Sequence, residues 1–200
     1  MKENQPLETL TDIRRIMDRS SRFLSLSGWS GVAAGICGSA GAFFARRYVN
    51  QSTAGASLPE AVLLKHLLYI ALLTLAAALA SGWFFTWQKS RREHRPLWDK
   101  GARNLLINLF IPLVAGGAFI AGLIFREAYH LLVPACLVFY GLALINASKY
   151  TLKDIRYLGL LEMLLGIACL FFDGLSFYFW VAGFGVLHII YGLIMWKKYA

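Results

Sequence analysis

Long apolar blocks constrain this chain more than any other feature of its sequence. The blocks carry few charged residues, and the charges gather between them; the six blocks run over 23–44, 62–85, 105–125, 131–147, 155–172 and 177–196. Most are close to the roughly 20 residues that a helix needs to cross the hydrocarbon of a bilayer. Isolated strands would leave backbone groups unpaired in lipid, so each block is expected to be a helix. The sequence therefore predicts an all-α, polytopic membrane protein with a bundle of six transmembrane helices.

The net positive charge is compatible with two kinds of partner, nucleic acid or lipid, and the positions of the charged residues distinguish them. The chain has 200 residues, 58% of them hydrophobic, and a formal net charge of +9. A basic balance of this size is also typical of nucleic-acid-binding domains. Here most Lys and Arg residues lie at the ends of apolar blocks, where they would meet lipid headgroups. The expected partner is the lipid bilayer and not a nucleic acid.

The same positive residues predict how the bundle is oriented. With the N-terminus inside, 16 of the 20 Lys and Arg residues lie on inner segments, and four lie outside: Arg46, Arg47, Lys65 and Arg126. Inner loops of membrane proteins carry such an excess of Lys and Arg. The sequence therefore predicts an N-in/C-in, multi-pass protein of the cell (cytoplasmic) membrane.

The sequence predicts one membrane domain preceded by a short N-terminal segment. Residues 1–22 form an N-terminal cytoplasmic segment with apolar residues at helical spacing, which predicts a short amphipathic helix on the inner surface. Its apolar face can rest on lipid, dock on the bundle or bind a partner. Residues 23–200 form the six-helix transmembrane domain. Its main inner loop, 88–103, is basic and is a second candidate surface for anionic lipid or a cytoplasmic protein.

The first apolar block carries a stripe of small residues. Ser27, Gly31, Gly35 and Ser39 recur every four positions. Small residues at this spacing let helix backbones approach closely. The stripe is predicted to pack helices, either inside the bundle or at a dimer seam.

Glu162 is the one acid inside the fifth block, and His188 is its predicted partner. Glu162 lies eight residues after Asp154, so about 12 Å deep at 1.5 Å per residue. His188 lies nine residues before Lys197, hence about 13 Å deep on the returning helix. A lone charge at such depth is costly, and intramembrane acids usually find partners. Consecutive helices joined by a short turn are expected to be neighbours, so the two side chains can meet.

Other polar residues fall in the same inner half. Asn108, Asn146 and Tyr191 are expected to line a polar, ligand-binding pocket with Glu162 and His188. The structural alternative is that these groups serve as interhelical hydrogen-bond partners, each of which stabilises the bundle by about 1 kcal/mol or less. Thr151 and Asp154 have capping-box spacing, so the fifth helix is expected to begin just after Thr151.

Catalysis and metal binding find little support in the sequence. Cys37, Cys136 and Cys169 lie in separate apolar blocks without paired spacing. No metalloprotease, nucleophile-elbow, phosphate-loop or dinucleotide motif occurs. The sequence predicts no enzyme activity, no metal and no cofactor.

Three stretches carry a family resemblance: "MDRSSRFLSLSGWSGVAAGI", "NASKYTLKDIRYLGLLEMLLG" and "FGVLHIIYGLIMWKKY". They resemble an uncharacterised family of small bacterial inner-membrane proteins of this length. The resemblance covers nearly the whole chain and implies a bacterial cytoplasmic membrane. It supplies no activity, substrate or site residue.

Two functions of different classes follow from these observations. The first is a small-molecule or proton-coupled receptor or carrier, whose polar pocket around Glu162 lies in the cytoplasmic half of the bundle. The second is a non-catalytic membrane scaffold or regulatory partner, which binds a cytoplasmic protein or anionic lipid through the N-terminal helix and loop 88–103.

Overall fold

A computed structural model describes residues 23, 26–54, 59–94, 96–172 and 174–199. Within these ranges the chain is helical apart from short connections, and no strand occurs. The all-α prediction is therefore confirmed for the described residues. The predicted amphipathic helix of residues 1–22 lies outside them, and so does its proposed partner surface.

Six long helical segments follow one another in the described ranges of the chain. In order, the elements are α2 (Gly28–Ala54), α3 (Glu60–Arg92), α4 (Lys100–Phe125), η1 (Tyr129–Leu131), α5 (Leu132–Ala147), η2 (Ser148–Tyr150), α6 (Asp154–Cys169), α7 (Ser176–Trp180), the π-helix η3 (Val181–Leu187) and α8 (His188–Tyr199). The last three are continuous and form one rod. Each apolar block of the sequence thus lies on one helical segment.

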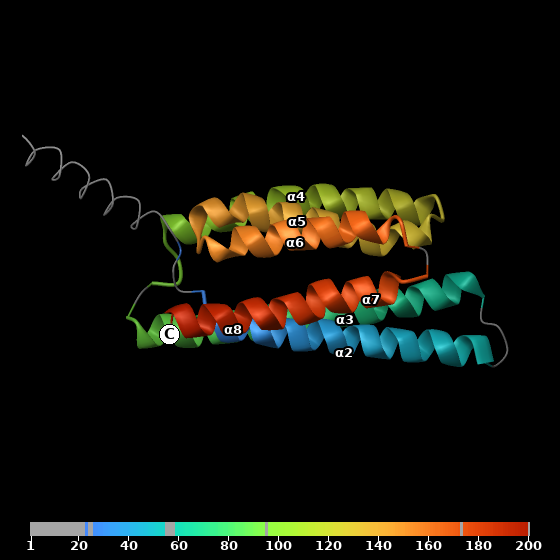
Figure 1. The fold of residues 1–200 in the computed structure, drawn as a ribbon, viewed down its shortest axis with the longest axis horizontal. Coiled ribbons are helices and arrows are strands. Elements are labelled where there is room, and N and C mark those ends of the chain that lie inside the picture. The colour runs from blue at the N-terminus through green and yellow to red at the C-terminus, as the bar shows by residue number, and fades with distance from the viewer. Residues whose placement is uncertain (1–22, 24–25, 55–58, 95, 173, 200) are drawn as a thin grey trace, which may run out of the picture.

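The helices form two layers. Figure 1 shows α4, α5 and α6 in one layer, and α2, α3 and the α7–η3–α8 rod in the other. The rod packs on α2 within its own layer. It also makes most of the contacts between the two layers, because it packs on α5 and α6 of the other layer. We call the end where α3 and α8 finish the C-terminal end, and the end where α2 finishes the opposite end.

Four segments in the described part of the chain are long and apolar enough to cross a membrane. They are Ala61–Arg92, Lys100–Phe125, Tyr129–Tyr150 and Ser176–Tyr199. α6 has 16 residues, about 24 Å at 1.5 Å per residue, and ends at Cys169, three residues before the predicted end of its block. α2 consists largely of Gly, Ala and Ser, which are less apolar than Leu or Ile.

Two local predictions at the C-terminal end of the bundle are wrong. Segment 88–103 is mostly helical, since α3 continues to Arg92 and α4 begins at Lys100 with the Asp99 carboxylate accepting from the Ala102 N–H at 2.6 Å. Thr151 does not cap the fifth helix. Its hydroxyl instead donates to the carbonyl of Phe23 at 2.9 Å, and α6 begins at Asp154 without a side-chain cap. The Thr151 side chain therefore bonds to a carbonyl that is distant in the sequence, and not to a backbone N–H group in the first turn of α6.

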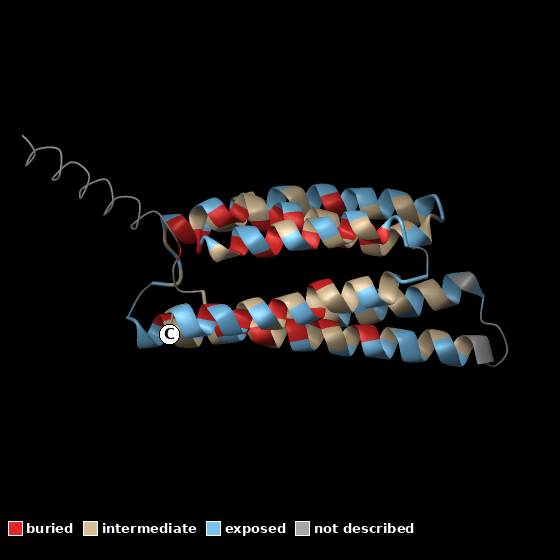
Figure 2. Ribbon diagram, in the orientation of Figure 1, coloured by how far each residue is buried: buried red, intermediate tan, exposed pale blue. Residues whose placement is uncertain are grey.

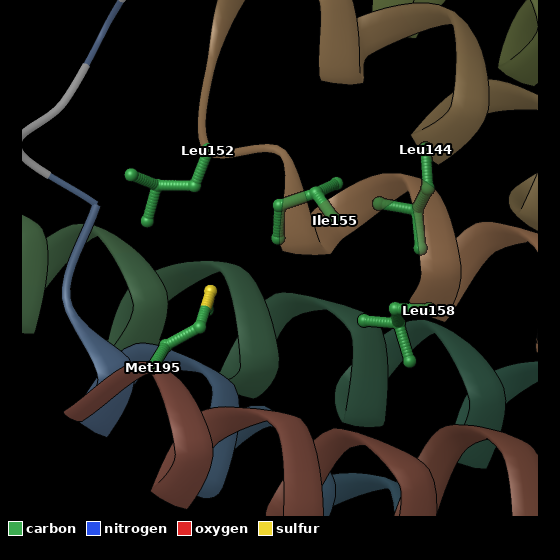
Figure 3. Packing of buried hydrophobic residues seen from close by; sticks show 5 residues of the cluster. All are labelled: Leu144, Leu152, Ile155, Leu158 and Met195. Carbon is green, nitrogen blue, oxygen red and sulfur yellow. The ribbon is translucent and has the colours of Figure 1, made fainter. Parts of the chain in front are cut away.

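The core is small and lies between the layers. Figure 2 shows buried positions concentrated on α5, α6 and the faces of α2 and α8 turned toward their neighbours. Figure 3 shows one cluster at the C-terminal end, in which Met195 of α8 meets residues of the other layer: Leu144, Leu152, Ile155 and Leu158. Large apolar side chains of α3 and α4 instead remain exposed, as expected of helices that face lipid.

Candidate functional site

The structure brings Glu162 and His188 together. α6 carries Glu162 and α8 begins with His188, and the Nδ1 atom of His188 lies 3.2 Å from Oε1 of Glu162. The Glu162 side chain is fully buried, and the His188 side chain is 7% exposed. Two helices from different layers therefore meet at an acid and a base that solvent does not reach.

Two further groups fix the imidazole ring of His188. Its Nδ1 lies 3.0 Å from the carbonyl oxygen of Gly183, which only accepts, so Nδ1 carries a hydrogen. Its Nε2 lies 2.8 Å from the hydroxyl of Tyr140 on α5. Glu162, His188 and Tyr140 form a contiguous group that we call the triad.

Glu162 itself is left without a hydrogen bond. Both carboxyl oxygens are buried and have no hydrogen-bond partner among the described residues. The 3.2 Å contact to His188 does not supply one, because the Nδ1 hydrogen is directed at the Gly183 carbonyl. The acid and the ring thus interact electrostatically. Buried carboxyl groups are normally hydrogen-bonded, so this orphaned acid is the most unusual group in the described structure.

The backbone beside the triad departs from a regular α-helix. The rod changes to the π-helix η3 over Val181–Leu187, immediately before His188. Short π-helical segments frequently occur at functional sites. Gly183, within η3, leaves space for the acid, because a Cβ there would lie 2.5 Å from Oε2 of Glu162 and equally close to Leu137. A side chain at this position would displace the ends of both Glu162 and Leu137.

Aromatic rings pack around the triad. The ring of Phe184 lies 5.2 Å from that of Tyr140 and 6.1 Å from that of His188, measured between centroids. Trp180 lies 4.5 Å from Phe184 on the other side, and its indole N–H donates to the carbonyl of Gly38 at 3.3 Å. The aromatic packing places the triad in a setting of low polarity.

Asn108 and Asn146 form a separate contact. The side-chain amide of Asn146 donates to the Asn108 carbonyl at 2.8 Å, and that of Asn108 donates to the Asn104 carbonyl at 2.9 Å. These bonds join α4 to α5 and do not involve the triad. Tyr191 packs beside the apolar cluster of Figure 3. The structure thus divides the five predicted pocket residues among three places.

A cavity of about 680 Å³ lies toward the opposite end of the bundle. None of the five predicted pocket residues lines it. It is bordered instead by α2, α3, α5 and α7, and Trp180 belongs both to its wall and to the aromatic packing around the triad.

The small-residue stripe of the first block packs inside the chain. Gly31 lies against Gly192 and the His188 carbonyl, Gly35 against Gly185 and Ile189, and the Ser39 hydroxyl against Gly185. Ser27, the first member, is buried. Of the two sequence alternatives, the structure contains the packing of α2 on the rod, which holds His188 in position.

Sequence reasoning missed Tyr140 and Gly183. The depth argument that paired Glu162 with His188 also applies to Tyr140, which lies seven residues before the end of α5, about 10 Å deep. That signal was available. Gly183 had no such signal, because one glycine among several in a span does not reveal which one borders a carboxylate.

The triad can hold a proton in two ways of equal net charge. A neutral acid beside a neutral imidazole and a carboxylate beside an imidazolium contain the same number of protons. Loss of that proton would leave an unpaired carboxylate in an apolar setting, which is costly. Among the described residues, no group of three His, Cys, Asp or Glu side chains is placed to hold a metal ion.

Comparisons with known proteins do not add to this description. No protein-family model, curated protein or solved structure matches the chain.

Proposed function

We propose that this protein is a proton-coupled receptor or carrier of the cell membrane, and that the triad is its proton-binding site. In this proposal the six apolar blocks cross the bilayer with both termini inside. The four long apolar segments and the charge distribution of the sequence support that topology.

One observation carries the proposal. Glu162 is fully buried, has no hydrogen-bond partner among the described residues and contacts His188 at 3.2 Å. An acid kept only as packing would be expected to satisfy both oxygens with donors. An orphaned acid beside a base is instead suited to share one proton with it, carried by either group, because neither arrangement leaves a net charge in the apolar setting.

The position of the triad supports coupling of the proton to a movement. Glu162 and Tyr140 belong to one layer, and His188 belongs to the other. A change in proton number would alter the electrostatic contact between the layers. The adjoining π-helix η3 is an element whose hydrogen-bond register can shift, which provides a physical means of response.

Glu162→Gln tests the proton site, since glutamine keeps the shape of the side chain and replaces the carboxyl group with an amide. The measurement is pH-difference infrared spectroscopy of the purified protein between pH 5 and pH 9, combined with thermal unfolding over the same range. We expect a carboxylic-acid band in the wild type that Glu162→Gln lacks. We also expect the variant to stay folded with a weaker dependence of melting temperature on pH.

Glu127→Gln is the matched control, because Glu127 is exposed at the opposite end. It should retain the band that is assigned to Glu162. Identical spectra and identical pH profiles for the wild type and Glu162→Gln would contradict the proposal and assign Glu162 a packing role. Tyr140→Phe, which leaves Nε2 of His188 without its hydroxyl partner, should shift the band without abolishing it.

A further inference from the structure

We propose that the cavity at the opposite end of the bundle binds an anionic membrane lipid. An acyl chain occupies the apolar cavity, and the headgroup lies at Arg46 on α2. This inference rests on the membrane-spanning part of the proposed function and not on the proton site.

The size and shape of the cavity suit one chain-like ligand. Its volume of about 680 Å³ lies within the roughly 300–1,000 Å³ of small-molecule sites. Its lining positions on α3 extend from Leu63 to Thr74, which is about 16 Å at 1.5 Å per residue. The cavity is thus elongated along the helices, in the direction that lipid chains take in a bilayer.

The deep wall of the cavity offers little to a polar ligand. Leucine, isoleucine, valine and alanine side chains predominate in the lining. Two polar groups in the wall already have partners in the chain: the hydroxyl of Thr74 donates to the Ile70 carbonyl at 2.8 Å, and the indole of Trp180 donates to the Gly38 carbonyl. The deep part therefore favours a hydrocarbon chain.

The positive charge in the lining favours an anionic headgroup. Arg46 is the charged side chain among the described lining residues, and these residues include no carboxylate. Its guanidinium carbon lies 4.4 Å from the ring centroid of Phe177 and 5.2 Å from that of Tyr178. These contacts orient the planar group beside the first residues of α7, where its N–H donors can pair with a phosphate.

The position of the cavity favours a lipid over a soluble ligand. α3 forms one wall, and its outward side chains, such as Leu72 and Leu79, are exposed as expected of a lipid-facing helix. A ligand from the surrounding bilayer need not cross a polar entrance. The apolar wall and the one charged side chain among its described lining residues, Arg46, match the two parts of an anionic lipid.

Lipid add-back to the delipidated full-length protein tests this inference. Phosphatidylglycerol and phosphatidylcholine with identical acyl chains are compared by native mass spectrometry and by thermal shift in a non-ionic detergent. We expect the wild type to prefer phosphatidylglycerol. Arg46→Gln should lose that preference, with binding of phosphatidylglycerol weakened by about fivefold, the factor that corresponds to one basic group near anionic lipid.

Arg47→Gln is the matched control, because Arg47 is the next residue, carries the same charge and does not line the cavity. It should keep the preference, and so should Arg46→Lys, which retains the charge. Ala45→Phe, which fills part of the lining, should weaken binding of both lipids.

Three results would overturn the inference: equal affinity of the wild type for the two lipids, equal losses in Arg46→Gln and Arg47→Gln, or unchanged binding in Ala45→Phe. Glu162→Gln should bind phosphatidylglycerol as the wild type does. A failure of the lipid site therefore leaves the infrared band of Glu162 in place, and a failure of the proton site leaves the lipid preference in place.

Discussion

At the residue scale, the triad depends on the absence of one side chain. Gly183 lies so close to Glu162 and Leu137 that a Cβ would approach an oxygen of the first and a methyl of the second at 2.5 Å. Its carbonyl also accepts the Nδ1 hydrogen of His188. Gly183 therefore controls both the room for the acid and the orientation of the base.

Gly183→Ala is expected to lower the free energy of unfolding by about 1–3 kcal/mol, as overpacking of a filled interior does. It should also shift the infrared band of Glu162, since the carboxyl group must move. Chemical unfolding in detergent and the pH-difference spectrum measure the two effects. Gly117→Ala is the control, because a Cβ at that helical position has nothing within 4 Å. Equal stability of the two variants would show that the site relaxes without cost.

At the element scale, the end of α8 is tied to both layers. The ammonium of Lys198 lies 3.0 Å from each carboxylate oxygen of Asp154 on α6, and the hydroxyl of Tyr199 donates to the same carboxylate at 2.8 Å. Lys89 of α3 donates to the Tyr199 carbonyl at 3.0 Å. These bonds fix the C-terminal end of the rod, in which His188 lies eleven residues before Tyr199.

The pKa of Asp154 gives this contact a pH dependence. Partial burial raises the pKa, but hydrogen bonds from Lys198 and Tyr199 outweigh it, so the pKa of Asp154 is lowered from its ordinary value. A lowered folded-state pKa stabilises the fold above the unfolded-state pKa of about 3.9, and this contribution is lost as pH falls through the folded-state pKa.

Asp154→Asn is therefore expected to lower the free energy of unfolding at pH 7 by about 1 kcal/mol, the upper range for a partly exposed ion pair. The difference from the wild type should shrink below about pH 4, where the carboxylate of the unfolded wild type begins to gain a proton, and vanish below the lowered folded-state pKa. Unfolding curves at pH 7 and pH 3.5 measure this. Lys198→Gln in a double-mutant cycle gives the coupling energy, and additive effects of the two substitutions would argue against a direct pair.

At the scale of the whole molecule, the two-layer arrangement concentrates the unusual features between the layers. The triad lies where α6 meets the rod, and the cavity lies between α2 and α3 on one side and α5 on the other. Trp180 belongs to the cavity wall and packs on Phe184, which packs on Tyr140 and His188. A relative movement of the layers would therefore affect both places.

The proposed topology predicts that the two ends of α4 face opposite sides of the membrane. Lys100→Cys and Arg126→Cys, in a chain whose native cysteines are alanine, form a matched pair because both replace an exposed base at an end of the same helix. In intact cells, a membrane-impermeant maleimide is expected to label residue 126 and not residue 100. Labelling of residue 100 alone would reverse the orientation, and labelling of both would contradict a crossing by α4.

The pattern of apolar and polar residues was enough to predict the helical segments and one contact of the site. Long apolar blocks are a property of composition along the chain, so the block 131–147 predicted α5 to within one residue of Leu132–Ala147. The depth of a residue along a helix is also a linear quantity, and it was enough to bring Glu162 to His188. The ends of the helices were predicted less well. α6 ends three residues before its apolar block does, and α3 continues into the predicted loop 88–103, because helix ends depend on local hydrogen bonds more than on hydropathy.

Which other side chains share the site depends on how the helices pack together. Asn146 lies six residues, about 9 Å, beyond Tyr140 along α5. Its amide donates to the backbone carbonyl of Asn108, whose own side chain bonds to Asn104. The rotation of α5 about its axis brings Tyr140 to His188, and the π-helix η3 places Gly183 beside the acid. The cavity with Arg46 arises where two layers fail to fill the space between them. Rotation, register and layer spacing are set by close packing of many side chains at once, and no single stretch of sequence contains them.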